Sequence, residues 1–187
     1  MLFLSVLSGG DELSRVSSIL LTSTEFVVNS NKEIIMSEQT GIGTNIVCQI
    51  GLVVKDIEKS AAAYCDILGL PHPAITVTDE YDKAQTVYRG QPSEARAKLA
   101  FFDMGQVQLE LIEPDGKPST WQEALDEKGE GVHHIAFFVK DSDKVVAYLE
   151  GKGAKLVQQG RYTGGMYSYV DAIPQLHLVL ELLENFA

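Results

Sequence analysis

Four side chains whose donor atoms suit a divalent metal ion stand at related places in this sequence. They are the amide of Gln49, the carboxylates of Glu110 and Glu181, and the imidazole of His134. Such oxygen and nitrogen donors are ordinary ligands of divalent transition metals. Each Glu lies in an otherwise apolar run, where an unpaired charge is costly to bury, and two carboxylates neutralise a 2+ ion. The set predicts a site for Co, Ni, Mn or Zn, and no other cofactor is predicted.

The placement of these residues follows an internal repeat. The segment that begins at Gln49 aligns with the segment that begins at His134, with five of eleven positions identical. The run VQLELIE aligns with LVLELLE, with four of seven positions identical, and this alignment brings Glu110 onto Glu181. Two similar modules therefore follow each other along the chain.

Each module is predicted to fold as a strand, a helix and three further strands (βαβββ). In the first module, Asp56 supplies a cap and apolar residues recur at helical spacing up to Gly69. In the second module, the cap is Asp141 or Ser142. Runs of apolar and β-branched residues give the expected strands. These are 46–54, 84–88, 98–103 and 107–112 in the first module, and 134–139, 155–158, 167–171 and 176–183 in the second.

The repeat also sets the expected domain boundaries. Residues 44–114 form the first module, residues 115–130 a hydrophilic linker, and residues 131–187 the second module. The two modules together make one domain of the α+β class. Residues 1–43 are expected to be a poorly structured extension, and their first apolar run lacks the basic residues of a signal peptide.

Strand alternation predicts which side chains share a face of the sheet. Gln49 and Glu110 lie opposite the apolar residues that a helix would cover. In the second module the alternation favours His134 as the inward ligand and assigns His133 to the outer face as a structural residue. If the modules pair pseudo-symmetrically, the amide, the imidazole and both carboxylates converge on one point. Pairing within one chain and pairing across a dimer both stay open.

Composition and charge exclude several classes of protein. The chain has 187 residues, 45% apolar and 22% charged, with a net charge of −11. This balance argues against nucleic-acid and anionic membrane partners, which attract clustered Lys and Arg, and no run reaches the roughly 18 apolar residues of a membrane span. Cys48 and Cys65 are too few for a disulfide framework. We expect a cytoplasmic homodimer that acts on a small molecule.

Two segments carry a resemblance to a known family. The run CQIGLVVKDIEKS, followed by YCDILGL up to Leu70, is similar to the opening of a vicinal oxygen chelate domain of the glyoxalase/bleomycin-resistance superfamily. The run GQVQLELIEP, followed by GEGVHHIAF, resembles methylmalonyl-CoA epimerases more closely. The resemblance covers about residues 44–184. It implies two βαβββ modules that form a cupped, barrel-like mixed sheet around a divalent metal, which chelates adjacent oxygens of a substrate.

The sequence departs from the epimerase pattern in two places. Gln49 stands where these epimerases usually have a His ligand, although a Gln/Glu/His/Glu set is similar to that of eukaryotic-type glyoxalase I. Residues 172–177, AIPQLH, replace the common Gly-Gly approach to the last ligand strand. The resemblance also implies a second acid ahead of the Glu110 strand, and this acid falls on Glu94.

Three functions stay open at this point. The first is a metal-dependent epimerase or racemase that moves a proton at a carbon α to a carbonyl, in a CoA thioester or a smaller carbonyl compound. Its expected catalytic residues are Glu181 and Glu94. The second is a glyoxalase I-type lactoylglutathione lyase, and the third is a metal-free ligand-binding or drug-sequestering module. A ring-cleaving dioxygenase is disfavoured because its iron needs two His and one carboxylate, and Gln49 takes one of those places.

Overall fold

The computed structural model describes residues 26–28, 34–36 and 40–186. The chain divides into two compact units, Met1–Thr40 and Gly41–Ala187. In the first unit, β1 (Phe26–Val28) pairs antiparallel with β2 (Ile34–Met36). The extension was predicted over residues 1–43, and apart from these strands its residues up to 39 lie outside the described residues. The strand pair was not expected from the sequence.

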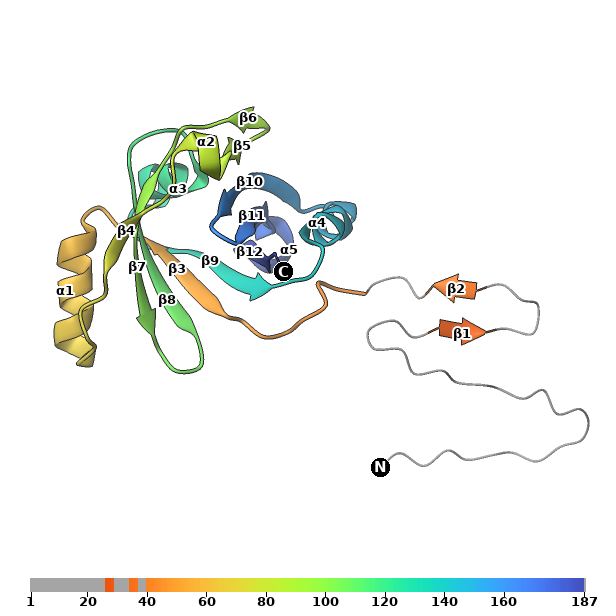
Figure 1. Cartoon of the computed structure of the whole chain (residues 1–187), viewed down its shortest axis with the longest axis horizontal. Helices are drawn as coiled ribbons and strands as arrows, with labels where there is room; N and C mark the ends of the chain where they lie inside the picture. The colour runs from red at the N-terminus through yellow and green to blue at the C-terminus, as the bar shows by residue number, and fades with distance from the viewer. Residues whose placement is uncertain (1–25, 29–33, 37–39, 187) are drawn as a thin grey trace, which may run out of the picture. The chain divides into compact units, whose positions relative to one another are not determined.

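The second unit contains the two predicted βαβββ modules (Figure 1). The first module consists of β3 (Gln49–Val53), α1 (Ile57–Leu68), β4 (Ile75–Val77), β7 (Ala97–Asp103) and β8 (Gln108–Pro114). The second consists of β9 (Gly131–Phe138), α4 (Ser142–Gly151), β10 (Lys155–Tyr162), β11 (Gly165–Asp171) and β12 (Val179–Asn185). The predicted fold class is therefore confirmed.

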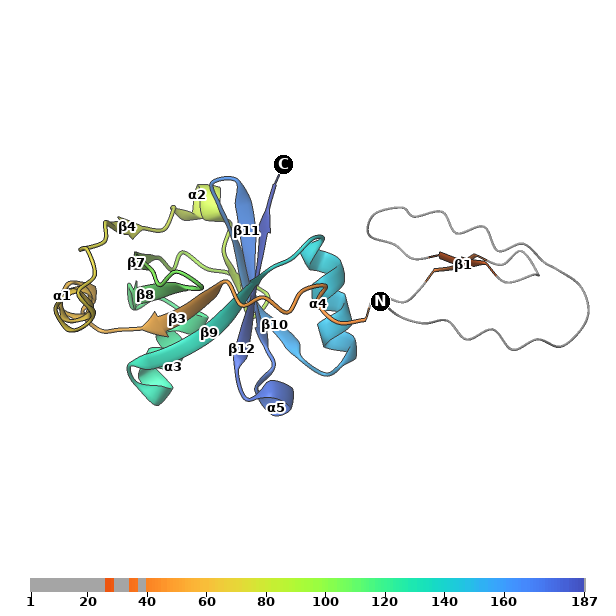
Figure 2. The same cartoon turned by 90° about the horizontal axis from the view of Figure 1, so that it is seen from below.

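These eight strands form one curled sheet of ten strands together with β5 (Val87–Tyr88) and β6 (Gln91–Pro92). The strand order is β4-β7-β8-β3-β9-β12-β11-β10-β5-β6. The first and last strands of each module are parallel, β3 with β8 and β9 with β12. An antiparallel ladder between β3 and β9 joins the modules, so they pair within one chain. The helices α1 and α4 lie at opposite ends of the curl (Figures 1 and 2).

Repeat-equivalent glutamates attach each of these helices to the last strand of its own module. Glu113 Oε2 accepts a hydrogen bond of 2.8 Å from the backbone N–H of Ile57, at the start of α1. Glu184 Oε2 accepts a hydrogen bond of 2.8 Å from the N–H of Ser142, at the start of α4. The first N–H groups of a helix have no partner inside the helix, and a carboxylate there also favours the helix dipole.

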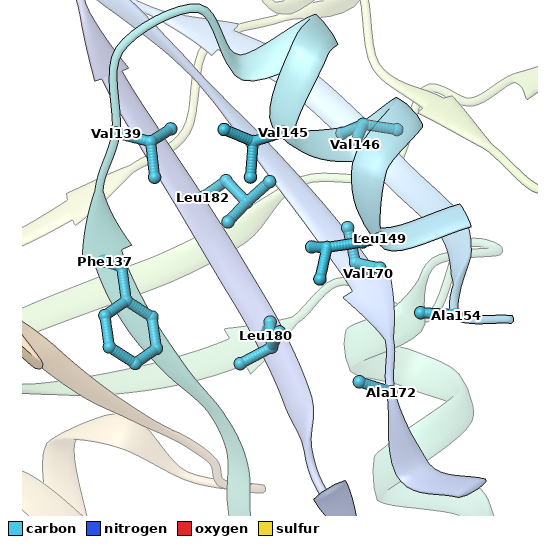
Figure 3. Close-up of a cluster of buried hydrophobic side chains, with 10 residues drawn as sticks. All are labelled: Phe137, Val139, Val145, Val146, Leu149, Ala154, Val170, Ala172, Leu180 and Leu182. Carbon is cyan, nitrogen blue, oxygen red and sulfur yellow. The ribbon is translucent and has the colours of Figure 1, made fainter. Parts of the chain in front are cut away.

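Buried apolar side chains hold the helices against the sheet. Under α1, Leu111 and Ala100 are fully buried, and Leu52 packs against the same cluster, as strand alternation predicts. Under α4, Val145 and Leu149 pack on Leu182 (Figure 3). A third cluster forms around Trp121 and Tyr169.

The segment between α1 and β7 differs from the prediction. A strand was expected over residues 84–88 in the first module, but Tyr81–Ala84 is a short helix, α2. The next residues form β5 (Val87–Tyr88), a hairpin with β6 (Gln91–Pro92) that pairs with β10 of the second module. Left-handed backbone angles at Gln85 and Arg89 turn the chain on either side of β5. The second strand of the first module is β4 instead.

Two smaller differences concern the connections. The predicted linker, residues 115–130, contains the helix α3 (Thr120–Lys128), capped by the Ser119 side chain. Only Thr120 and Trp121 of this helix are buried, so its hydrophilic composition resembled that of a loop. The last strand begins at Val179, because α5 (Ile173–Leu176) precedes it.

Candidate metal centre

Three of the four predicted ligands converge on the inner face of the sheet. Glu110 lies on β8, His134 on β9 and Glu181 on β12, and one donor atom from each lies within 4.8 Å of the others. His134 Nε2 is 3.0 Å from Glu181 Oε2 and 3.5 Å from Glu110 Oε2. The three strands lie within the four-strand stretch β8-β3-β9-β12, so the repeat places the two carboxylates on either side of the imidazole.

The fourth predicted ligand, Gln49, joins the cluster through its amide oxygen. Gln49 Oε1 is 3.3 Å from His134 Nε2, and Gln49 Nε2 donates a hydrogen bond of 2.7 Å to Gln108 Oε1. Because the NH₂ group is engaged by Gln108, the carbonyl oxygen of Gln49 is the atom that faces the carboxylates. Gln108 lies two residues before Glu110 in β8, so strand alternation puts both side chains on the same face.

The burial of the carboxylates and their unpartnered oxygens are compatible with a bound cation. Glu110, His134 and Glu181 are 6%, 0% and 4% exposed. Glu110 Oε2 and Glu181 Oε2 are buried, and within the described residues neither accepts a hydrogen bond. Buried anionic oxygens without partners are costly, and a cation between them would remove this cost. The donor set of two carboxylates, one imidazole and one amide oxygen therefore fits a divalent transition metal.

The protonation states of the cluster follow from burial and mutual charge. Burial and, to a smaller extent, the charge of Glu181 raise the pKa of Glu110 to about 8, against the opposing effect of His134. Burial lowers the pKa of His134, but the carboxylates of Glu181 and Glu110 outweigh this effect, so the net shift is upward. At neutral pH the metal-free cluster therefore holds protons that a metal ion must displace.

His133 does not lie on the outer face, and the prediction of strict alternation is wrong at this point. Gly51 pairs with His134 and Leu52 pairs with Val132, so His133 is an extra residue in the ladder. A β-bulge of this kind re-aims side chains, and His133 Nδ1 lies 3.0 Å from His134 Nδ1. Burial and the charge of His134 together lower the pKa of His133 to about 3, against the opposing effect of a hydrogen bond with the Thr120 backbone.

The cluster forms part of the wall of a cavity of about 440 Å³. Its other walls are mostly apolar and aromatic, with Phe101 and Phe138 among them, and Arg161 is the sole Lys or Arg among the described lining residues. The segment that runs from β4 to β5 crosses the cavity, because β5 pairs with β10 of the second module. This segment contributes Val77, Asp79 and Thr86 to the lining. The remaining lining residues include Gln49, Gln108, Trp121, Tyr162, Tyr167, Tyr169 and Asn185.

The tyrosines of the cavity are neutral hydroxyl groups. Burial raises the pKa of Tyr167 to about 12, and burial with the charges of Glu181 and Glu110 raises that of Tyr169 well above its usual value. Tyr169 accepts a hydrogen bond of 3.1 Å from Trp121 Nε1. These residues shape and orient the site, but they do not supply a proton acceptor at neutral pH.

The structure does not bring Glu94 into the site. Its side chain is 79% exposed and lies 3.7 Å from Lys117 Nζ at the surface, and Glu94 is absent from the lining of the cavity. The reason is the course of the preceding chain, because β5 and β6 leave the first module and Glu94 follows them. The catalytic role predicted for Glu94 therefore does not fit the structure.

The paired modules form a fold that is shared with solved structures. The methylmalonyl-CoA epimerase of Mycobacterium tuberculosis is 22% identical with a TM-score of 0.54, over 77% of this chain and 92% of that one. A methylmalonyl-CoA epimerase solved in complex with methylmalonyl-CoA is also 22% identical, with a TM-score of 0.54, over 75% and 94% of the two chains. At this identity the likeness concerns the fold.

Sequence comparison gives the family. Residues 48–170 match the model of the Glyoxalase/Bleomycin resistance protein/Dioxygenase superfamily, and the chain belongs to it. The uncharacterized protein YaeR of Escherichia coli is 32% identical over 152 residues, which are 77% of this chain and 99% of YaeR. The uncharacterized protein YqjC of Bacillus subtilis is 29% identical over 110 residues, 59% of this chain and 69% of YqjC. Within the described part of the chain, every helix is too short or too polar to span a membrane.

Proposed function

We propose that this protein is a divalent-metal-dependent isomerase that moves a proton at a carbon next to a carbonyl group, and that it acts as an epimerase or racemase. The observation that carries this proposal is the pair of buried, unpartnered oxygens of Glu110 and Glu181 beside His134. A bound ion would supply Lewis-acid stabilisation of the charge that develops on the carbonyl oxygen, worth several kcal/mol. Gln49, Glu110, His134 and Glu181 would hold it.

The chain's own residues supply the proton chemistry. Epimerisation needs a proton acceptor on one face of the substrate carbon and a donor on the other. We assign Glu181 as one of these groups, because its Oε2 has no hydrogen bond to give up and the residue lines the cavity. Glu110 replaces Glu94 as the second candidate, since it faces the same point from the other side of the β3–β9 pair.

The cavity favours a compact substrate. A CoA thioester carries several phosphates, which are bound by Lys and Arg side chains. Arg161 alone offers such a charge among the described lining residues, and it forms no ion pair with another described residue. We therefore propose a small carbonyl compound whose body lies on the aromatic walls and whose single anionic group lies near Arg161, rather than a CoA thioester.

A second candidate function rests on the amide ligand. Gln49, held by Gln108, completes a Gln/Glu/His/Glu set of the glyoxalase I type. A glyoxalase would convert the hemithioacetal of methylglyoxal and glutathione into S-lactoylglutathione by proton transfer between adjacent carbons. The homodimer and the cytoplasmic location predicted from the sequence stay predictions.

The test combines metal analysis with proton exchange. Purified protein is analysed for metal, stripped, and reloaded with Co, Ni, Mn or Zn. Candidate carbonyl compounds are then followed by NMR in deuterated water. An epimerase incorporates deuterium at the α carbon without changing the constitution of the compound, whereas a glyoxalase forms S-lactoylglutathione. A protein without stoichiometric metal, in which Glu110→Gln changes no ligand binding, would instead be the metal-free binding module.

A further inference from the structure

The bulged residue His133 makes one specific contact with the metal centre. Its Nδ1 lies 3.0 Å from Nδ1 of His134, with the two rings at 90°. At this separation one nitrogen must carry a proton and the other must present a lone pair. The identity of the donor decides which nitrogen of His134 is free to bind a metal.

The contacts of Nε2, the second ring nitrogen of His134, indicate which histidine donates this hydrogen bond. Nε2 of His134 is the atom that faces Glu110, Glu181 and the Gln49 oxygen. A nitrogen that binds a metal cannot carry a proton, so the proton of His134 must sit on Nδ1. His133 Nδ1 is then the acceptor. The opposite arrangement, with His133 donating, would place a proton on Nε2 and block the metal.

We propose that His133 is a positioning residue that holds His134 in the Nδ1–H form and aims Nε2 at the metal, an inference that rests on the proposed metal centre. The His133 ring is itself held in place. It is 7% exposed and stands edge-on to Tyr169, with ring centroids 5.0 Å apart and an angle of 87°. Tyr169 is fixed in turn by Trp121. Outer residues that orient a metal-binding imidazole commonly change metal affinity about 10- to 100-fold.

Three variants of His133 distinguish the loss of the hydrogen-bond acceptor from the loss of side-chain packing. His133→Asn places an oxygen near the position of Nδ1, His133→Gln places its amide near the position of Nε2, and His133→Leu has no acceptor. We expect Zn²⁺ binding, measured by competition with a chromophoric chelator, to weaken about 10- to 100-fold in the Leu and Gln variants. The Asn variant should stay within a few-fold of wild type.

A spectroscopic measurement on the wild type does not depend on how the variants fold. In ¹⁵N-labelled protein, we expect a through-hydrogen-bond coupling between the two Nδ1 atoms, with the proton on His134, in both the metal-free and the Zn²⁺-loaded form. A proton assigned to His133 Nδ1, or His133→Leu binding Zn²⁺ as tightly as wild type, overturns the proposal for His133 alone. Failure of the wild type to bind any of the four metals overturns the metal centre and this role with it.

Discussion

Gly51 lies directly opposite His134 in the β3–β9 ladder, and the imidazole ring occupies the space of a side chain at Gly51. A Cβ at this position would lie 2.0 Å from Cε1 of His134 and 2.5 Å from Nδ1. Gly51 also pairs with Glu110 in the ladder with β8, so it lies between two of the proposed ligands. The glycine within an otherwise apolar strand therefore marks the close approach of a functional side chain.

Gly51→Ala is expected to displace His134 and to weaken metal binding at least 100-fold, with a loss of about 1–3 kcal/mol in stability from overpacking. The matched control is Gly160→Ala, whose Cβ would lie 2.7 Å from the ring of Tyr167. This control should lose comparable stability while it keeps the metal. Calorimetric metal titration and denaturant unfolding check both variants. Normal metal affinity in Gly51→Ala would contradict the assigned role of His134.

The raised pKa of Glu110 predicts an unusual pH dependence for the metal-free protein. Because the folded-state pKa is about 8 and the usual value is 4.5, the folded protein binds the proton more tightly than the unfolded chain. The contribution of Glu110 to stability is therefore greatest below pH 4.5 and is lost as the pH rises to about 8. The loss amounts to a few kcal/mol at most. The raised pKa of His134 acts in the same direction.

Unfolding of the metal-free protein in denaturant between pH 5.5 and 8.5 measures this dependence. We expect stability to decline across that range in the wild type and to decline less in Glu110→Gln, which cannot ionise. Loading with metal should reverse the trend, since deprotonated ligands bind the ion. A metal-free wild type that shows the same pH dependence as Glu110→Gln over this range would show that Glu110 is already ionised there.

The two strand glutamates that bind helix starts should contribute to stability without touching the metal centre. Removing the carboxylate in Glu184→Ala leaves the N–H of Ser142 without its partner, at a cost of about 1 kcal/mol. Glu113→Ala should cost at least as much, because Glu113 also pairs with Lys98. Thermal unfolding measures these losses, with Glu150→Ala on the exposed surface of α4 as the control. Unchanged stability in both variants would mean that the two contacts are not maintained in solution.

The proposed substrate class predicts a selective role for Arg161. Hydroxamates bind metals through adjacent oxygens, so acetohydroxamate tests the metal centre alone. The monohydroxamates of malonate, succinate and glutarate add a carboxylate at increasing distance. Arg161→Gln should weaken the binding of the tightest anionic probe about 5- to 10-fold, as expected for an exposed charged contact. The affinity for acetohydroxamate should stay unchanged.

The control for Arg161 is Arg89→Gln. Arg89 is paired with Glu123 and lies outside the lining of this cavity, so the variant should bind every probe like the wild type. Equal affinity of the wild type for charged and uncharged probes, measured by the absorption of the Co²⁺- or Ni²⁺-loaded protein, would count against an anionic substrate and leave the metal centre intact.

Much of the centre could be predicted from the sequence because it depends on regular features. Strand alternation fixes the face of Gln49 and Glu110, and the repeat relates Glu110 to Glu181. Both features hold in the structure, and the ligand atoms meet as a result. The capping residue Asp56 and the left-handed Gly69 likewise bound α1 as predicted.

The parts that could not be predicted depend on irregular backbone. One extra residue in the β9 ladder turns His133 inward, and alternation has no means of locating such a bulge. The path from β4 to β7 turns at three left-handed residues, Gln85, Arg89 and Gly90, and two of these are not glycines. That path carries Glu94 to the surface, so counting residues back from a known strand misplaced it.

Metal titration of the stripped protein measures whether the proposed ligands bind an ion. We expect one Co, Ni, Mn or Zn ion per chain, with at least about 100-fold weaker binding in Glu110→Gln and in Glu181→Gln, each of which removes one charged ligand. Glu94→Gln, a change at the surface, should bind the ion like the wild type. Absence of binding by the wild type, or unchanged affinity in both ligand variants, would contradict the account.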